Sequence, residues 1–327
     1  NAESQAAGRG YLSILVGTSL MLFLPAIFWI WFQTGTLDFR SGGILEGKFP
    51  TEYLSFLVAL LIFGIGKAAI MPIHRWLPAA MVAPTPVSAL LHAVAVVKAG
   101  VFSFLVVVVY IIGPEYLFES KASDWLIWLA SFTILASSII AISKDDLKAR
   151  LAYSTISQLS YIILGAALAT TFAIKGASFH IITHAIGKIT LFFCAGAIYV
   201  TAHVKKISQL NGLGYKTPLI FFAYTLGALS IIGVPPFVGS WSKFYLILGS
   251  LEADYLFVAI ILGISSLLNI YYLLEPVFVG FRKKLTKDIH LTNAPLAVWP
   301  PVVTGLGCIF LFFFANYFDE IINGVLI

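Results

Sequence analysis

The sequence predicts an all-α polytopic membrane protein with about nine transmembrane helices, two of them broken. Three observations lead to this prediction: 60% of the 327 residues are hydrophobic, only 11% are charged, and the mean hydropathy is +0.96. A soluble domain of this length does not need so much apolar surface, whereas a polytopic membrane protein does.

Nine segments are apolar over enough length to cross a bilayer, which takes about 20 residues of helix. In chain order they lie near residues 11–33, 53–73, 86–112, 124–143, 151–171, 177–201, 218–250, 255–280 and 296–322. The second and seventh segments are each interrupted by glycine and proline. Because proline removes a backbone donor and clashes with the preceding turn, each of these two is expected to be a broken helix.

The basic residues outside the apolar interior gather on one face of this topology. If the N-terminal side is cytoplasmic, that face carries Arg9, Arg75, Lys144, Lys148, Arg150, Lys205, Lys206, Lys216, Arg282, Lys283, Lys284 and Lys287. The other face carries Arg40, Lys48, Lys121 and Lys175. Since cytoplasmic loops are enriched in lysine and arginine, we expect a multi-pass protein of the inner (cytoplasmic) cell membrane, with residue 1 inside and the C-terminus outside.

Cofactor chemistry is not expected within this chain. Its two cysteines, Cys194 and Cys308, lie in predicted spans and are too few for an iron–sulfur cluster. No loop carries a phosphate-binding glycine pattern, and no catalytic constellation is visible. Any reductase activity would therefore belong to a complex that contains the chain.

Four lysines interrupt the apolar spans: Lys67, Lys98, Lys188 and Lys243. A lysine at bilayer depth costs about 2.5–3.5 kcal/mol on insertion scales, so four facing lipid would cost roughly 10–14 kcal/mol. That sum is comparable to the whole stability of a typical domain. The lysines are therefore expected to face protein or water, as the groups of a proton or cation path do.

Two of these lysines accompany the predicted helix breaks. The break residues are Gly66 and Pro72 beside Lys67, and Pro235 and Pro236 before Lys243. Irregular backbone at membrane depth is tolerated only inside protein or along a cavity, and paired interrupted spans are typical of the ion site of inverted-repeat transporters. A kink made only for packing is the alternative, but two breaks with adjacent lysines favour an ion path.

The span near 177–201 carries His180, His184 and Lys188 at four-residue spacing, which places them on one helical stripe about 6 Å apart. One interpretation is a proton wire, because histidine gains and loses protons near neutral pH and a buried lysine can join it. A zinc site is a second interpretation, disfavoured because no third ligand lies nearby in the sequence. A satisfied core histidine is the third, and three polar groups in register make it the weaker account.

Other polar residues receive more modest interpretations. His92 and Lys98, six residues apart, point about 120° from each other on a helix and should meet different neighbours. Glu275, next to Pro276 and the basic run 282–287, is expected to form an interfacial salt bridge. The run 144–150 is expected to combine a helix start with basic membrane anchors.

These residues belong to motifs that resemble the antiporter-like membrane subunits, a family that includes Mrp cation/proton antiporter subunits, membrane-arm subunits of complex I and subunits of membrane-bound hydrogenases. The matching segments are GKAA at 66–69, PIHRWLP at 72–78, APTPVSALLHA at 83–93, LAYSTISQ at 151–158, the stretch from 180 to 196, and PPFVGSWSK at 235–243. The segment 94–100 is more similar to the Mrp D-like and hydrogenase-associated branch. The resemblance covers nearly the whole chain.

The resemblance implies a fourteen-helix fold with two inverted repeats, of which these nine spans would be the last nine. Residues 1–113 would end the first repeat, with its broken helix near 64–80. Residues 114–280 would form the second repeat, with its broken helix at 218–250, and 281–327 would hold a loop and the final span. The implied proton path is Lys67, His92, Lys98, His180, His184, Lys188 and Lys243. Lys67 would pair with a glutamate on an earlier span, which we expect the rest of the protein or a partner chain to supply.

We therefore expect an ion-translocating subunit that works beside other membrane subunits and the lipid bilayer, with protons as the transported ion and sodium as a further candidate. Nucleic acid is not an expected partner. Mrp-type sodium/proton antiport and redox-driven proton pumping are the alternatives within this class. A non-conducting scaffold subunit is the alternative from another class, and the four lysines argue against it.

Overall fold

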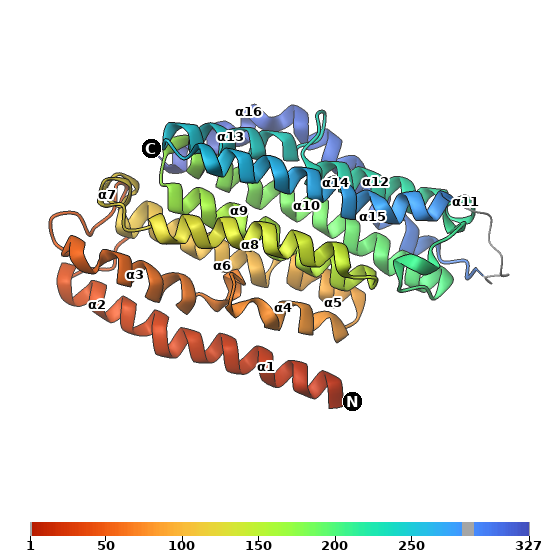
Figure 1. The fold of residues 1–327 in the computed structure, drawn as a ribbon, viewed down its shortest axis with the longest axis horizontal. Helices are drawn as coiled ribbons and strands as arrows, with labels where there is room; N and C mark the ends of the chain where they lie inside the picture. Colours follow the sequence, from red (N-terminus) through yellow and green to blue (C-terminus); the bar gives the residue numbers. More distant parts are fainter. Residues whose placement is uncertain (1, 283–290, 327) are drawn as a thin grey trace.

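The computed structural model describes residues 2–282 and 291–326, and within these ranges every regular element is a helix. Seven helical segments are long and apolar enough to cross a membrane, and two shorter apolar helices begin two broken spans. Together they give the nine passes that the sequence predicts. All nine run nearly parallel to the long axis of one elongated bundle (Figure 1).

The helices have the following bounds. They are α1 (Ala2–Thr18), α2 (Leu24–Thr34), α3 (Thr51–Gly64), α4 (Trp76–Ala79), α5 (Thr85–Ala89), α6 (Val96–Val107), α7 (Pro114–Ser120), α8 (Asp124–Ser143), α9 (Leu147–Leu168), α10 (Thr171–Ala202), α11 (Leu213–Lys216), α12 (Pro218–Ile232), α13 (Gly239–Glu252), α14 (Leu256–Arg282), α15 (Pro295–Phe310) and α16 (Ala315–Leu326). Single π turns join α1 to α2 and α5 to α6, and a short 3-10 helix joins α15 to α16.

The first broken span continues past the apolar segment 53–73. After α3 ends at Gly64, short 3-10 turns and α4 alternate with non-helical residues at 65 and 69–72, and the last turn ends at Val82, close to the expected bounds of 64–80 for the broken helix. Arg75 consequently lies within the span and not in a loop. The polar residues of the break lower the local hydropathy and hide this continuation. The Trp76 indole N–H donates to the Gly66 carbonyl (3.1 Å) and so bridges the break.

The second broken span follows its prediction closely. Helix α12 ends at Ile232, Gly233 adopts a left-handed conformation with φ +85°, and the chain becomes helical again at Gly239. A Cβ atom on Gly233 would lie 2.8 Å from Cδ of Lys243. Glycine therefore meets two needs here, the positive φ and the close approach of the lysine side chain.

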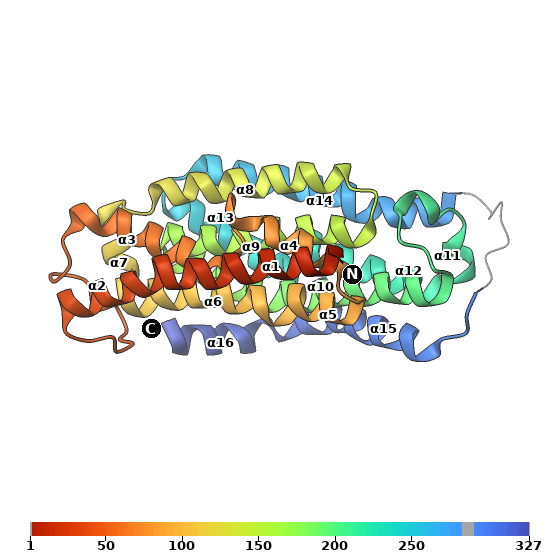
Figure 2. The ribbon, with the colours of Figure 1, turned by 90° about the horizontal axis from the view of Figure 1, so that it is seen from below.

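Helices α9 and α10 form the centre of the bundle. The apolar window of α9 is 94% buried, against 17% for the span that contains α1 and α2. Helix α10 contacts α9, α12, α13 and α15. Seen from below, α8 and α14 border one side of the bundle and α15 and α16 border the other (Figure 2). Side chains on α9 and α10 are therefore the best shielded from lipid.

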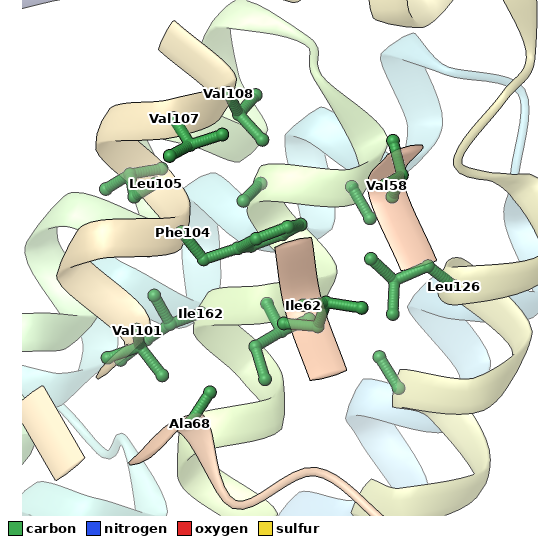
Figure 3. Packing of buried hydrophobic residues seen from close by; sticks show 14 of the residues in the cluster. Val58, Ile62, Ala68, Val101, Phe104, Leu105, Val107, Val108, Leu126 and Ile162 are labelled. Atoms are coloured by element: carbon green, nitrogen blue, oxygen red, sulfur yellow. The ribbon is translucent and has the colours of Figure 1, made fainter. Parts of the chain in front are cut away.

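Apolar side chains hold the first broken span against the central helices. Figure 3 shows Val58 and Ile62 of α3 facing Val101 and Phe104 of α6, with Leu126 of α8 nearby. All five side chains are at most 1% exposed. This packing fixes the start of the break beside α6.

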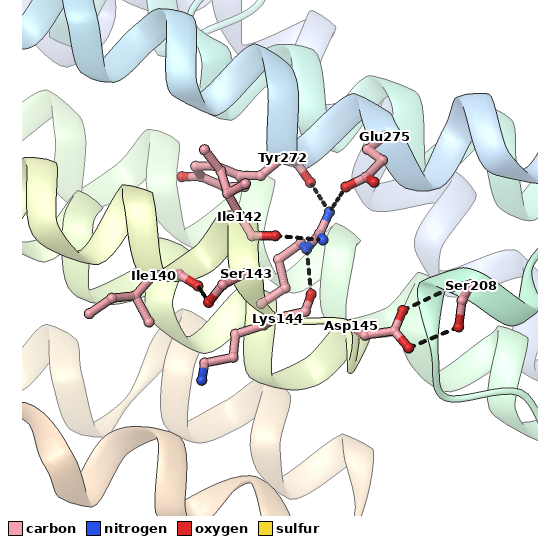
Figure 4. Close-up of polar contacts among 9 residues, drawn as sticks. Ile140, Ile142, Ser143, Lys144, Asp145, Ser208, Tyr272 and Glu275 are labelled. Atoms are coloured by element: carbon pink, nitrogen blue, oxygen red, sulfur yellow. Dashed lines mark hydrogen bonds and ion pairs between the residues drawn. The ribbon is translucent and has the colours of Figure 1, made fainter.

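A buried arginine ties together one end of the bundle. Arg150 donates to the carbonyls of Lys144 (2.9 Å), Ile142 (3.2 Å) and Tyr272 (3.2 Å), as Figure 4 shows, and pairs with Glu275. The carbonyl groups of residues 142 and 144 lie at the end of α8, where a helix lacks internal partners. The predicted interfacial salt bridge of Glu275 is thus made with Arg150, while residues 283–287 of the basic run lie outside the described residues.

Candidate functional site: a buried row of lysines and histidines

Helix α10 carries the predicted stripe into the centre of the bundle. His180 and Lys188 are 2% and 0% exposed, and His184 lies between them with 0% exposure. The rings of His180 and His184 are 6.0 Å apart between centroids, as expected for residues one turn apart. The described residues include no group of three His, Cys, Asp or Glu side chains that could hold a metal ion.

Lys98 reaches this stripe from α6. Its Nζ lies 2.7 Å from Nδ1 of His184, and both side chains are buried. A hydrogen bond of this length requires one bridging proton between the two nitrogens. A cationic lysine against the ring also disfavours a metal ion at His184. The first contact of the row therefore joins two groups that can exchange a proton.

His180 connects the stripe to the second helix break. Its Nδ1 lies 2.9 Å from Oγ of Ser242, the residue before Lys243. The Tyr161 ring of α9 stacks on the imidazole of His180 at 5.2 Å and lies 5.4 Å from Nζ of Lys243. Ser242 and Tyr161 thus link two predicted residues, although the sequence did not single out either one.

The helix break supplies a partner for Lys243. The Lys243 Nζ donates to the carbonyl of Ile232 (2.8 Å) and to Oγ of Ser266 on α14 (2.9 Å). Ile232 is the last residue of α12, so its carbonyl has no partner within the helix and lies at the negative end of the helix dipole. Ending α12 in mid-span therefore creates a site that stabilises an ammonium group.

Lys188 and His92 lie beside this row and are not hydrogen-bonded to it. Lys188 Nζ donates to the carbonyl of Leu151 (3.3 Å), and the His92 ring lies 5.2 Å from that of Phe192. Both nitrogens of His92 have no hydrogen-bond partner among the described residues. The prediction that His92 and Lys98 meet different neighbours is confirmed, because Lys98 contacts His184.

Lys67 differs from the other three lysines. Its side chain is exposed on the surface of the described bundle, whereas Lys98, Lys188 and Lys243 are buried. Its backbone packs tightly on α6, where a Cβ atom on Gly100 would lie 2.5 Å from the Lys67 carbonyl carbon. The fold therefore places the backbone of Lys67 against Gly100 of α6, two residues from Lys98, without enclosing the Lys67 ammonium group.

The site contains polar residues that the sequence interpretation missed. They are Ser242, Ser266 and Tyr161. A signal was available in the density of hydroxyl and amide side chains over 154–161, which is unusual for an apolar span. Which of those groups face the lysines could only be decided by the packing of α9 against α10 and α14.

Comparisons with known sequences identify relatives of this chain. A family model described as NADH:quinone oxidoreductase/Mrp antiporter, TM matches residues 1–269. NADH-quinone oxidoreductase subunit N of Desulforudis audaxviator is 34% identical over 290 residues, covering 86% of this chain and 57% of the relative. The chloroplastic NAD(P)H-quinone oxidoreductase subunit 5 of Phaseolus vulgaris is 32% identical over 307 residues, covering 89% of this chain and 39% of the relative. The chain thus spans about half the length of these relatives.

Solved structures share the fold. A chain of the Mrp complex from a Dietzia species matches with a TM-score of 0.84 and 23% identity, covering 98% of this chain and 67% of that one. A chain of the membrane-bound sulfane sulfur reductase, an archaeal respiratory membrane complex, matches with a TM-score of 0.85 and 24% identity, covering 99% and 66%. A chain of respiratory complex I from Thermus thermophilus matches with a TM-score of 0.75 and 22% identity, covering 95% and 67%.

Proposed function

Because the chain belongs to the NADH:quinone oxidoreductase/Mrp antiporter transmembrane family, we propose that it moves protons across the membrane as one subunit of a larger membrane complex. The proposed path runs along the buried row of Lys98, His184, His180 and Lys243. Lys67 is its entry at the first helix break, and Lys188 and His92 modulate its charge from the side.

The chemistry of the row supports stepwise transfer. Lys98 and His184 share one hydrogen-bonded proton, so a proton that arrives at one nitrogen can leave from the other. Ser242 holds the imidazole of His180 beside the next lysine. Two neighbouring cations in an apolar interior repel each other strongly, so charging one lysine favours loss of the proton from the next.

The driving force needed for such steps is modest. One elementary charge that moves down 100 mV releases about 2.3 kcal/mol. Either an ion gradient or a redox reaction in another subunit can supply energy of this order. Both energy sources are candidates. The relatives are named as subunits of NADH-quinone oxidoreductases, and the fold is shared with a chain of an Mrp complex.

The observation that carries the proposal is the environment of Lys243. A buried ammonium group is stabilised by an unpaired helix-end carbonyl and by one serine hydroxyl, with no carboxylate among its hydrogen-bond partners. Neutral partners of this kind hold the proton without trapping it in an ion pair.

We further propose the topology that the charge pattern predicts, with residue 1 cytoplasmic, and the inverted-repeat boundaries near residues 113 and 280.

The test is proton flux in inverted membrane vesicles that contain the complete complex, with and without sodium. We expect Lys243→Ala to lower flux roughly tenfold or more, the rate equivalent of about 1.4 kcal/mol of barrier, and Lys243→Arg not to restore it, because arginine does not release its proton. Lys216→Ala, at an exposed position of α11, is the matched control.

The outcomes separate the candidate functions. Unchanged flux in a correctly assembled Lys243→Ala complex would exclude the proton path and favour a non-conducting scaffold. Flux that requires sodium would indicate Mrp-type antiport, whereas flux that requires a redox substrate would indicate a redox-driven pump.

A further inference from the structure

A groove on the side of the bundle lies apart from the lysine and histidine row. It runs along α10 between α5 and α15, is bordered by the start of α1, and has a volume of about 1330 Å³. Both α5 and α15 contact α10 and lie toward the end of the bundle that carries α11 (Figure 2). Within the described part of the chain, no residue of the lysine and histidine row lines this cavity, which we call the α5–α15 groove.

The walls of the α5–α15 groove are apolar and open. Val82, Val200 of α10 and Leu296 of α15 line it, and all three side chains are exposed, Leu296 to 90%. A large exposed apolar surface is typical of a site that binds lipid or protein. Because apolar side chains that face lipid are ordinary in a membrane protein, the depth and the charge of the groove must decide what binds there.

The depth of the groove corresponds to one leaflet of a bilayer. Its floor is a close contact between α5 and α10, where a Cβ atom on Gly196 would lie 3.1 Å from Cγ2 of Thr85. Its deepest residue on α10 is Phe193, nine residues before the helix ends at Ala202, which is a distance of about 14 Å along the axis. The hydrocarbon core of one leaflet is about 15 Å thick. The groove therefore has the length of a lipid chain that enters from this end.

Two lysines lie at the mouth of the groove, where α9 begins. The backbone N–H of Leu147 donates to the carbonyl of Lys205 (3.0 Å), which brings Lys148 and Lys205 to the same end of the groove. Lys148 Nζ donates to the carbonyls of Met81 (2.8 Å) and Ala83 (2.6 Å). An ammonium group has three N–H donors, so Lys148 retains one for a ligand.

The mouth of the groove carries more positive than negative charge. Asp146 also lines it, but its Oδ1 accepts the backbone N–H of Ala149 (2.8 Å) and so caps α9. Neither lysine forms an ion pair with a carboxylate of the described residues. Lys205 Nζ instead lies 5.0 Å from the ring centroid of Tyr199, and tyrosine is typical of the membrane–water interface. The groove therefore complements a ligand that is anionic at one end and apolar along the rest.

We propose that the α5–α15 groove binds one anionic phospholipid, with its phosphate at Lys148 and Lys205 and an acyl chain between α5 and α15. Lysine is a common phosphate ligand, and basic pockets between spans at the cytoplasmic surface are typical of anionic lipid sites. An apolar helix docked here would leave the two ammonium groups without a counter-charge, and a free phosphate would leave the apolar walls uncovered. The proposed topology places the mouth at the cytoplasmic surface. Such a site does not require that the chain conduct protons.

The test is photocrosslinking in phosphatidylcholine vesicles that contain the complete complex. A small fraction of the lipid, either phosphatidylglycerol or phosphatidylcholine, carries a diazirine in its acyl chain, and the labelled peptides are mapped by mass spectrometry. Phosphatidylglycerol should label the α10 segment 193–200 roughly tenfold or more above phosphatidylcholine, and Lys148→Gln and Lys205→Gln should each lower this ratio roughly fivefold. Lys206→Gln is the matched control, because it removes an exposed neighbouring charge that does not line the groove, and it should leave the ratio unchanged.

Three outcomes would overturn the lipid site. The first is equal labelling of the segment 193–200 by the two lipids in wild type, and the second is a wild-type ratio in both lysine variants. The third is a segment 193–200 that neither lipid labels while other spans of the same complex are labelled, which would show that protein covers the groove. Because Lys148 also holds two backbone carbonyls, Lys205→Gln decides alone if Lys148→Gln does not assemble.

Discussion

Lys243 is held by the last carbonyl of α12 on one side and by a serine of α14 on the other. Lys98 instead faces an imidazole, and Lys188 faces a backbone carbonyl of α9. None of the three ammonium groups has a carboxylate among the hydrogen-bond partners found in the described residues. At the scale of single residues, backbone carbonyls, a serine hydroxyl and a histidine therefore offset the free-energy cost of burying an ammonium group. None of these partners is a carboxylate, so the proton can leave again.

Asp145 shows the opposite arrangement at the surface. The backbone N–H of Ser208 (2.9 Å) and its hydroxyl (2.8 Å) donate to the carboxylate and hold the pKa of Asp145 below its ordinary value of 3.8. Because the pKa is lowered in the folded protein, this contribution to stability is complete above pH 3.8 and is lost as the pH falls further. The two hydrogen bonds hold the segment 203–209 beside the start of α9.

We expect Asp145→Ala to increase amide hydrogen exchange in the segment 203–209 at neutral pH, because the carboxylate acceptor is lost. Wild type should approach the exchange of the variant only below about pH 3.8, after correction for intrinsic rates. Ser208→Ala, which removes one of the two bonds, should give an intermediate result. Equal protection in wild type and Asp145→Ala at pH 7 would contradict the assignment.

At the scale of elements, each helix break depends on a glycine that permits close approach. Gly233 admits the Lys243 side chain, and Gly100 of α6 admits the backbone of the first break at Lys67 and Ala68. Both contacts leave less room than a methyl group needs. The lysines of the breaks are thus positioned by backbone geometry as well as by their own side chains.

Gly100→Ala should therefore destabilise the protein by about 1–3 kcal/mol, the usual cost of overpacking a tight contact. Thermal unfolding of the detergent-solubilised complex is the measurement. Gly263→Ala on α14, where an added Cβ meets nothing within 4 Å, is the control and should be neutral or slightly stabilising. A similar melting temperature for the two variants would show that the first break tolerates displacement from α6.

At the scale of the whole molecule, the nine passes leave the chain with two distinct ends. One end carries the loops at 144–146 and 203–212 and the buried Arg150, and the other carries the loops at 35–50 and 169–170. The N-terminus lies toward the first end and the C-terminus at the second (Figure 1). This arrangement is the one expected for an odd number of passes.

The proposed sidedness can be tested by cysteine labelling, because both native cysteines are buried. We expect a membrane-impermeant maleimide to label Asp38→Cys in intact cells and Lys206→Cys only in inverted vesicles, since both positions are exposed at opposite ends. Labelling after denaturation gives the total for each variant. The reverse pattern would overturn the proposed orientation.

The sequence by itself determined the fold class, the nine passes, both helix breaks and the family. These follow from apolar length, from glycine and proline at membrane depth and from the motifs around Lys67, His92 and Lys243, all of which are local in the chain. It also selected the lysines and histidines as candidate site residues, because such groups are too costly in a span to be incidental.

Only the tertiary structure decided which polar groups meet. The contacts of Lys98 with His184, His180 with Ser242, and Arg150 with Glu275 join residues 86, 62 and 125 positions apart. Serine and tyrosine are inexpensive in a helix, so neither Ser242 nor Tyr161 stands out in the sequence. Their contacts depend on the rotation of α9 and α13 about their axes, and the packing of whole helices sets that rotation.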